Sequence, residues 1–229
     1  MNFEEAIRLT EILVGFAFIQ QSLEHLKSFS NEKFIFLPRL MLSIVLVTGF
    51  YTSWILILLF ILSLVMLYRF QGPYNGGADR MSLLILICLL LTHLASNQYW
   101  KEVAFGYLAL QLVLSYFISG WVKIVNPDWR NGRALRDVFE YSAYPVSQSL
   151  RAWSKSPRLL LIMSWLVMLF ELIFPFSLFS QHTLIIALVV AAGFHFANAC
   201  LFGLDRFFWI WIAAYPSIFW FQLRLSFIM

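Results

Sequence analysis

The chain has 229 residues, of which 61% are hydrophobic, 18% aromatic and only 12% charged. A soluble domain carries about 25% charged residues, so this composition excludes an ordinary soluble protein and indicates a polytopic membrane protein in contact with lipid. The net charge of +4 comes without a patch of basic and aromatic residues, which argues against nucleic acid as a partner.

Eight apolar runs follow in chain order, each close to the length that a bilayer requires. The first is the weakest because it contains Glu11, Gln20 and Gln21, and the sequence leaves open whether it crosses the bilayer. The expected spans are residues 6–24, 36–50, 52–69, 81–96, 103–124, 158–179, 183–202 and 206–223. They predict an all-α integral membrane bundle of about eight transmembrane helices, with residues 1–229 forming a single domain.

The basic residues predict the orientation of these spans. If all eight cross the membrane, only Arg8, Lys101 and Arg224 fall on the side of the even-numbered loops. The other side collects Lys27, Lys33, Arg39, Arg69, Arg80, Lys123, Arg130, Arg133, Arg136, Arg151, Lys155, Arg158 and Arg206. Because basic loops stay in the cytoplasm, we expect cytoplasmic odd-numbered loops and both termini outside, in a bacterial inner membrane.

The longest segment outside the expected spans covers residues 125–157. Its basic side chains alternate with aromatic ones, a mixture that suits the headgroup zone of a membrane. We expect a short amphipathic helix near residues 131–140 on the cytoplasmic face, followed by a turn at Pro145. A solvated loop is the alternative.

The fifth span ends in a polar stripe. Ser115, Ser119 and Lys123 are four residues apart, so they share one face of a helix whose other faces are apolar. A lysine in hydrocarbon is costly unless it is paired, reaches water or faces a cavity, and it is a functional-site hypothesis by default. We expect Lys123 to line an internal cavity with the sixth or seventh span. The alternative is a lysine that extends to the headgroups, because Asn126-Pro127 ends the helix one turn later.

The sixth and seventh spans each carry an ionisable residue. Glu171 precedes Pro175 by four residues, so we expect a kink and a free carbonyl beside a carboxylate that could hold a cation, a water or Lys123. His195 and Asn198 share a face and could orient a small polar group. Either site could instead only link helices. His93, in an apolar setting, is expected to be a packed core residue, and the histidine spacing predicts no metal site.

Short pieces in a fixed order carry a family resemblance. A weaker match upstream joins Tyr74-Asn-Gly-Gly77 to Asn97-Gln-Tyr-Trp100. The main pieces are Tyr116-Phe-Ile-Ser-Gly120, Lys123, Asp128-Trp129 with Gly132, Phe170-Glu-Leu172, Phe194-His195, Asn198 and Leu201-Phe-Gly203. Together they resemble the transmembrane part of the vitamin K-dependent gamma-glutamyl carboxylases and their bacterial relatives, the horizontally transferred transmembrane (HTTM) family.

The resemblance implies a helical membrane bundle with a central pocket for a quinone or hydroquinone, and no metal. In the carboxylases a lysine in the matching stretch deprotonates vitamin K hydroquinone, and an amine among apolar walls can serve as a base. The predicted catalytic residues are therefore Lys123, His195 and Glu171, and the predicted cofactor-binding residues are Asn198, Ser119, Tyr116 and Trp129.

The sequence departs from the carboxylases at two positions. It has one lysine, followed by Ile124, where they have two, and Gln98 where they have a histidine. A large substrate domain is also missing from the 229 residues. These departures keep three functions open: a carboxylase-like or epoxidase-like enzyme for a lipid-soluble molecule, a non-catalytic membrane partner in peptide maturation or secretion that binds a peptide or another membrane protein, and a small transporter.

Overall fold

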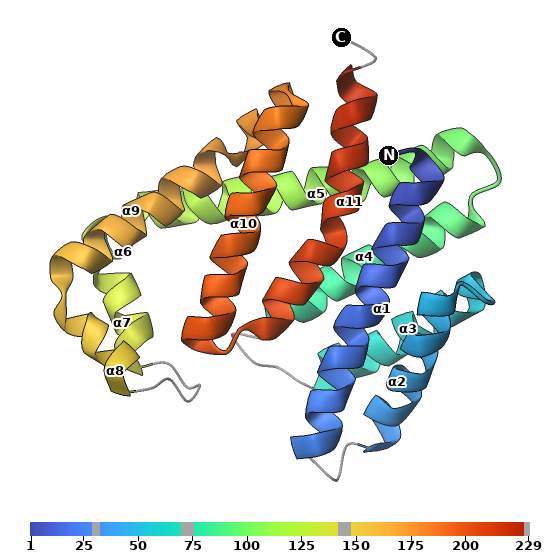
Figure 1. Cartoon of the computed structure of the whole chain (residues 1–229), viewed down its shortest axis with the longest axis horizontal. Helices are drawn as coiled ribbons and strands as arrows, with labels where there is room; N and C mark the ends of the chain where they lie inside the picture. Colours follow the sequence, from blue (N-terminus) through green and yellow to red (C-terminus); the bar gives the residue numbers. More distant parts are fainter. Residues whose placement is uncertain (29–32, 70–75, 142–147, 227–229) are drawn as a thin grey trace. The chain divides into compact units, whose positions relative to one another are not determined.

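The computed structural model describes residues 1–28, 33–69, 76–141 and 148–226, and the regular structure of these residues is helical (Figure 1). The long helices are α1 (Phe3–Ser28), α2 (Lys33–Thr48), α3 (Thr52–Arg69), α4 (Gly76–Leu94), α5 (Gln98–Val125), α9 (Pro157–Ile173), α10 (Gln181–Phe202) and α11 (Asp205–Ser226). The short ones are α6 (Pro127–Arg130), α7 (Arg133–Tyr141), α8 (Gln148–Arg151) and the 3-10 helices η2 (Ala152–Lys155) and η3 (Phe174–Phe179).

Each of the eight expected spans is a helix, which confirms the all-α class. Five helical stretches in the described residues are long and apolar enough to cross a bilayer: Thr52–Arg69, Gly77–Leu94, Gln98–Val125, Pro157–Phe179 and Gln181–Phe202. The short α2 has only 16 residues, and α1 and α11 are likewise not among the five. The chain is therefore an integral membrane protein, while the count of eight spans and their orientation stay predictions.

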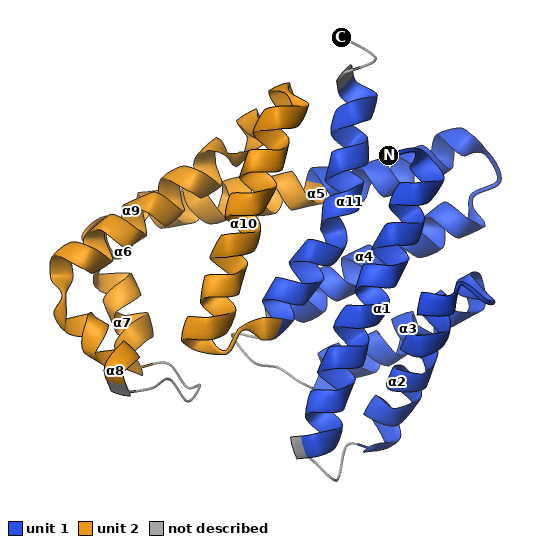
Figure 2. Cartoon of the chain, viewed as in Figure 1, with its two compact units in different colours: residues 1–110, 206–229 blue, residues 111–205 orange. Residues whose placement is uncertain are grey.

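The chain forms two compact units, which are coloured separately in Figure 2. Unit 1 contains residues 1–110 and 206–229, and unit 2 contains residues 111–205. In unit 1, α1 packs on α2, α2 on α3 and α3 on α4. The contact of α1 with α2 is close at Gly15, where an added Cβ would lie 3.2 Å from the carbonyl oxygen of Ser43. The prediction of one domain stays a prediction.

The segment of residues 125–157 contains the amphipathic helix that the sequence predicts near residues 131–140. In the structure this helix is α7, which covers Arg133–Tyr141. Its apolar residues Leu135 and Phe139 are buried in a cluster with Leu160 of α9 and Phe202 of α10, while Arg136 is exposed. The apolar face of α7 therefore contributes to a protein core. The predicted turn at Pro145 lies outside the described residues, and the cytoplasmic placement stays a prediction.

Both predicted helix breaks beside the polar stripe occur. α5 ends at Val125, and the side chain of Asn126 accepts a hydrogen bond from the backbone nitrogen of Asp128 at 2.9 Å, which begins α6. α9 changes from an α-helix to the 3-10 helix η3 next to Pro175, because proline cannot donate the backbone hydrogen bond that would continue the α-helix. The first break places Lys123 in the last turn of α5.

Candidate functional site

The site in unit 2 begins with one face of α5. Tyr116, Ser119 and Lys123 follow one another at intervals of three and four residues, so their side chains leave the helix on the same side. Ser115, which the sequence groups with them, instead donates to the carbonyl of Gln111 in its own helix at 2.7 Å. The polar face of α5 that contacts α9 and α10 therefore runs through Tyr116 in place of Ser115.

Lys123 forms an ion pair with Glu171 of α9. Its Nζ lies 2.6 Å from both carboxylate oxygens of Glu171 and donates to Ser119 Oγ, also at 2.6 Å. Ser119 Oγ in turn donates to Glu171 Oε1 at 3.2 Å. The Glu171 side chain is only 4% exposed and that of Lys123 16% exposed. The two charges compensate each other where water cannot screen them, which is how a charged pair is tolerated in an apolar bundle.

Gly120 makes this pairing possible. A Cβ at this position would lie 2.9 Å from both the Glu171 Cβ and the backbone nitrogen of Leu172, which is closer than real Cβ contacts allow. Glycine therefore lets the backbone of α5 come close to α9, next to the ion pair.

Lys123 also contacts an aromatic ring. Its ammonium lies 5.3 Å from the centre of the Trp129 ring, within the range of a cation–π contact.

A second polar pair lies on the same face of α5. The hydroxyl of Tyr116 is 2.8 Å from Nε2 of His195 in α10, and both side chains are buried. The Tyr116 ring also packs against Phe174 and Phe170, with centroid distances of 4.1 and 5.9 Å. The two polar pairs therefore lie on one face of α5 in apolar surroundings.

An apolar groove lies beside the second pair. It has a volume of about 470 Å³ and is lined by residues of α9, η3 and α10, including Phe170, Phe174, Ser177 and Thr183. Phe170 and Phe174 also pack against Tyr116, so these two rings stand between the groove and the Tyr116–His195 pair. A lipid-soluble molecule that displaced a phenylalanine ring would reach the polar pair from this groove.

The structure thus brings together six of the seven predicted site residues in two groups, Lys123 with Glu171, Ser119 and Trp129, and Tyr116 with His195. Within the described part of the chain, no hydrogen bond joins the side chain of Asn198 to either group; its backbone carbonyl accepts from Leu204 at 3.3 Å and helps to end α10. Lys123 faces α9 as predicted, but the groove is not lined by it.

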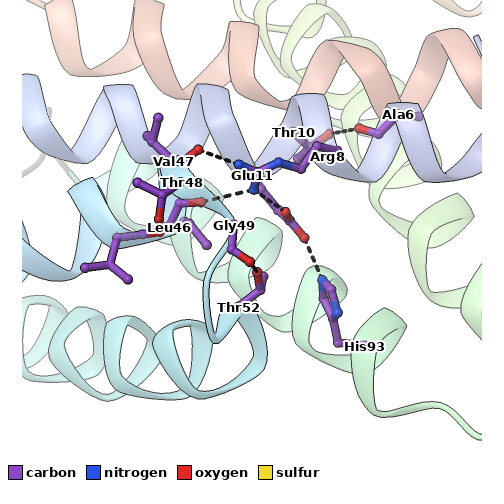
Figure 3. A network of polar contacts seen from close by, with 11 residues as sticks. Ala6, Arg8, Thr10, Glu11, Leu46, Val47, Thr48, Gly49, Thr52 and His93 are labelled. Carbon is purple, nitrogen blue, oxygen red and sulfur yellow. Dashed lines mark hydrogen bonds and ion pairs between the residues drawn. The ribbon is translucent and has the colours of Figure 1, made fainter.

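A polar network in unit 1 was not predicted (Figure 3). Glu11, whose side chain is 3% exposed, lies 2.6 Å from Nε2 of His93 and 2.8 Å from Nη1 of Arg8. Arg8 also donates to the carbonyls of Leu46 and Val47 at the end of α2. The expectation that His93 is a packed core residue is wrong, because the His93 side chain is 29% exposed and lies against the buried carboxylate of Glu11. The sequence contained one signal for this contact, since Glu11 and His93 are ionisable residues in two apolar runs. A single sequence does not show, however, that these two residues pair with each other.

Gln98, which stands where the carboxylases have a histidine, is exposed at the start of α5. Its side-chain amide donates to Glu102 one turn later at 3.0 Å. Among the described residues there is no group of three or more His, Cys, Asp or Glu that could hold a metal ion.

The fold and the site define a helical integral membrane protein with paired ionisable residues buried between its helices. A model of the HTTM domain matches residues 14–222, which is most of the chain, and the protein therefore belongs to the HTTM family. This confirms the resemblance found in the sequence, and it supports a carboxylase-like membrane domain at the level of the family. No curated protein and no solved structure matches the chain.

Proposed function

We propose that the protein is a membrane-embedded enzyme that acts on a quinone-like, lipid-soluble molecule, with Lys123 as the base. The observation that carries the proposal is the buried Lys123–Glu171 pair, 2.6 Å apart, on the same helix face as the Tyr116–His195 pair. Membership of the HTTM family supports the same reading. A pair of ionisable groups held between apolar membrane helices is a functional-site hypothesis by default, and acid–base chemistry is one such function.

The pair has a simple way to produce a base. A lysine held by a carboxylate carries a proton, and transfer of this proton to Glu171 leaves a neutral amine on Lys123 and a neutral carboxyl group on Glu171. The total charge of the pair is zero before and after the transfer, so the transfer leaves no isolated charge in the apolar surroundings. Ser119, which lies within hydrogen-bond distance of both groups, keeps the amine in place.

The apolar groove suits a quinone-like molecule in its lining and its size. Its lining is almost wholly aliphatic and aromatic, and its volume of about 470 Å³ lies within the range of pockets for small molecules. Tyr116 and His195 would orient the polar ring of such a molecule, Phe170 and Phe174 would stack on it, and Lys123 would take up a hydroxyl proton. A bound hydroquinone would be oxidised by four electrons to the quinone epoxide, so that one atom of O2 enters the epoxide and the other leaves as water.

The experiment uses the purified chain in detergent with vitamin K hydroquinone and dissolved oxygen. Epoxide and water are the expected products, in a one-to-one ratio, with the epoxide measured by chromatography. Lys123→Arg should abolish the product because arginine stays protonated at any working pH, whereas Glu171→Gln should lower it. Arg130→Lys, at an exposed position of the same unit, is the control that should keep full activity. Product formation by Lys123→Arg at the rate of the unchanged protein would refute the role of Lys123.

One observation favours a second function, a non-catalytic membrane partner in peptide maturation or secretion. The Lys123–Glu171 pair satisfies its own charges, which a purely structural link between α5 and α9 also requires. Under this reading Lys123→Arg keeps the charge and should be nearly silent in a secretion or maturation assay. The same variant therefore separates the two functions, provided that its amount in the membrane is unchanged.

A further inference from the structure

Arg39 is the buried cation of unit 1 that lacks a carboxylate partner. Its side chain is 1% exposed in α2, yet its Nη1 donates only to the sulfur of Met66 at 3.0 Å, and its guanidinium lies 4.0 Å from the centre of the Phe18 ring. Its Nε has no hydrogen-bond partner among the described residues. A thioether and an aromatic face are weak partners for a charge, so this arginine is under-compensated.

The same Phe18 also lines a small cavity. The cavity is lined by Phe18 and Gln21 of α1, Ser82 of α4 and Arg206 of α11, together with Ala17, Ala78 and Ile210. Gln21 and Ser82 are each 5% exposed, whereas Arg206 is only half-buried and connects the cavity to the surface. α4 and α11 come close here, since a Cβ on Gly77 would lie 2.7 Å from the Phe207 ring.

The charged side chains near the cavity include two arginines and Asp79. Arg39 and Arg206 each carry one positive charge, and Asp79 is the acid close enough to act on both. Among the described residues no ion pair joins Asp79 to either arginine. The Gln21 amide can donate a hydrogen bond into the cavity. The Ser82 hydroxyl already donates to the carbonyl of Ala78 at 2.9 Å, so it can only accept there.

We infer that this cavity binds one oxygen of a phosphate group, with Arg206 and Gln21 as its direct partners and Arg39, in contact with the Phe18 ring, as a buried charge nearby. The volume of about 10 Å³ accepts a single water-sized atom, so the rest of the phosphate stays outside beside Arg206. Arginine is well suited to phosphate, and basic pockets between membrane helices bind lipid headgroups. Arg206 lies on the side of the chain that the sequence predicts to be cytoplasmic, where such headgroups are found.

The test uses the full chain and two probes. In detergent, inorganic phosphate is titrated at constant ionic strength with chloride as the balancing anion, and the melting midpoint is followed by tryptophan fluorescence. In nanodiscs, phosphatidylcholine alone is compared with a mixture that contains phosphatidylglycerol. Protection by inorganic phosphate in detergent identifies a free phosphate site, and protection by phosphatidylglycerol without protection by inorganic phosphate identifies a headgroup site.

Four variants locate the effect. Arg206→Gln should raise the half-maximal phosphate or lipid concentration about tenfold or more, since it loses a charge-assisted contact. Arg39→Met should raise it as well, and Asp79→Asn should lower it because a competing negative charge is gone. Arg224→Gln, on the same helix and paired with Glu102 at 3.3 Å, is the control that should leave it unchanged.

Three results would each overturn the inference. The first is a melting midpoint that responds to neither probe, which would mean that the cavity holds only water. The second is an equal shift in Arg206→Gln and Arg224→Gln, which would mean that phosphate acts on the surface in general. The third is weaker binding in Asp79→Asn. Because Asp79→Asn tests for tighter binding, the inference stays falsifiable even if Arg39→Met fails to fold.

Discussion

Removal of the Glu171 charge tests how much the Lys123–Glu171 ion pair contributes to the stability of the protein. In Glu171→Gln the Lys123 ammonium keeps Ser119 but loses both carboxylate contacts of 2.6 Å. Loss of one partner from a buried ion pair costs about 3–5 kcal/mol, and we expect the lower end because the Lys123 side chain is 16% exposed. At about 2–4 °C per kcal/mol in a chain of this length, the melting temperature should fall by about 6–12 °C.

The assay is thermal unfolding of the purified protein in detergent, followed by tryptophan fluorescence. Glu140→Gln is the matched control, because it breaks an exposed ion pair with Arg136 of 3.5 Å that contributes only about 0.5 kcal/mol. The double variant Lys123→Met with Glu171→Gln removes both charges and should regain most of the lost stability. A melting temperature of Glu171→Gln within about 2 °C of the unchanged protein, or a double variant as unstable as the single one, would refute the reasoning.

Three further predictions test other parts of the structure. Gly120→Ala places a methyl group 2.9 Å from atoms of α9 and should destabilise by about 1–3 kcal/mol, whereas Gly193→Ala, with nothing within 4 Å, should be neutral or stabilising in the same melting assay. Arg8→Gln removes the donors to the last carbonyls of α2, so amide hydrogen exchange should accelerate at the end of α2 and remain unchanged in α10. A cysteine at Arg136, with the exposed Cys200 replaced by serine, should react with a membrane-impermeant reagent only from the cytoplasmic side; labelling of intact cells from outside would reverse the predicted orientation.

The helices were predictable because each is bounded by a signal that acts locally. Asn126-Pro127 and Pro175 end or change their helices through backbone chemistry that depends only on neighbouring residues. Some boundaries were missed by several residues. α4 begins at Gly76, five residues before the expected start, because a polar first turn carries no apolar signal although its backbone is helical.

The sequence could predict which site residues share one face of α5, but not most of their contacts with other helices. The spacing of Ser119 and Lys123 places them together on α5, and Glu171 was an expected partner because few other charges occur in the spans. The Tyr116–His195 contact and the Glu11–His93 contact join residues 79 and 82 positions apart. Such pairs depend on how the helices are set beside one another, and no local pattern encodes this.

Lys123 and Arg39 differ in how their charge is compensated among the described residues, and this difference supports different proposed roles for them. Lys123 has its own carboxylate at 2.6 Å, so the pair can exchange a proton internally without any external ion. Arg39 has a sulfur atom and an aromatic ring in place of a carboxylate, and arginine does not lose its proton in proteins. A permanently charged group cannot remove its charge by proton transfer as a lysine can, and its compensation must come from an anion outside its own contacts. We therefore propose proton chemistry for Lys123 in unit 2, and anion binding for Arg39 and Arg206 in unit 1.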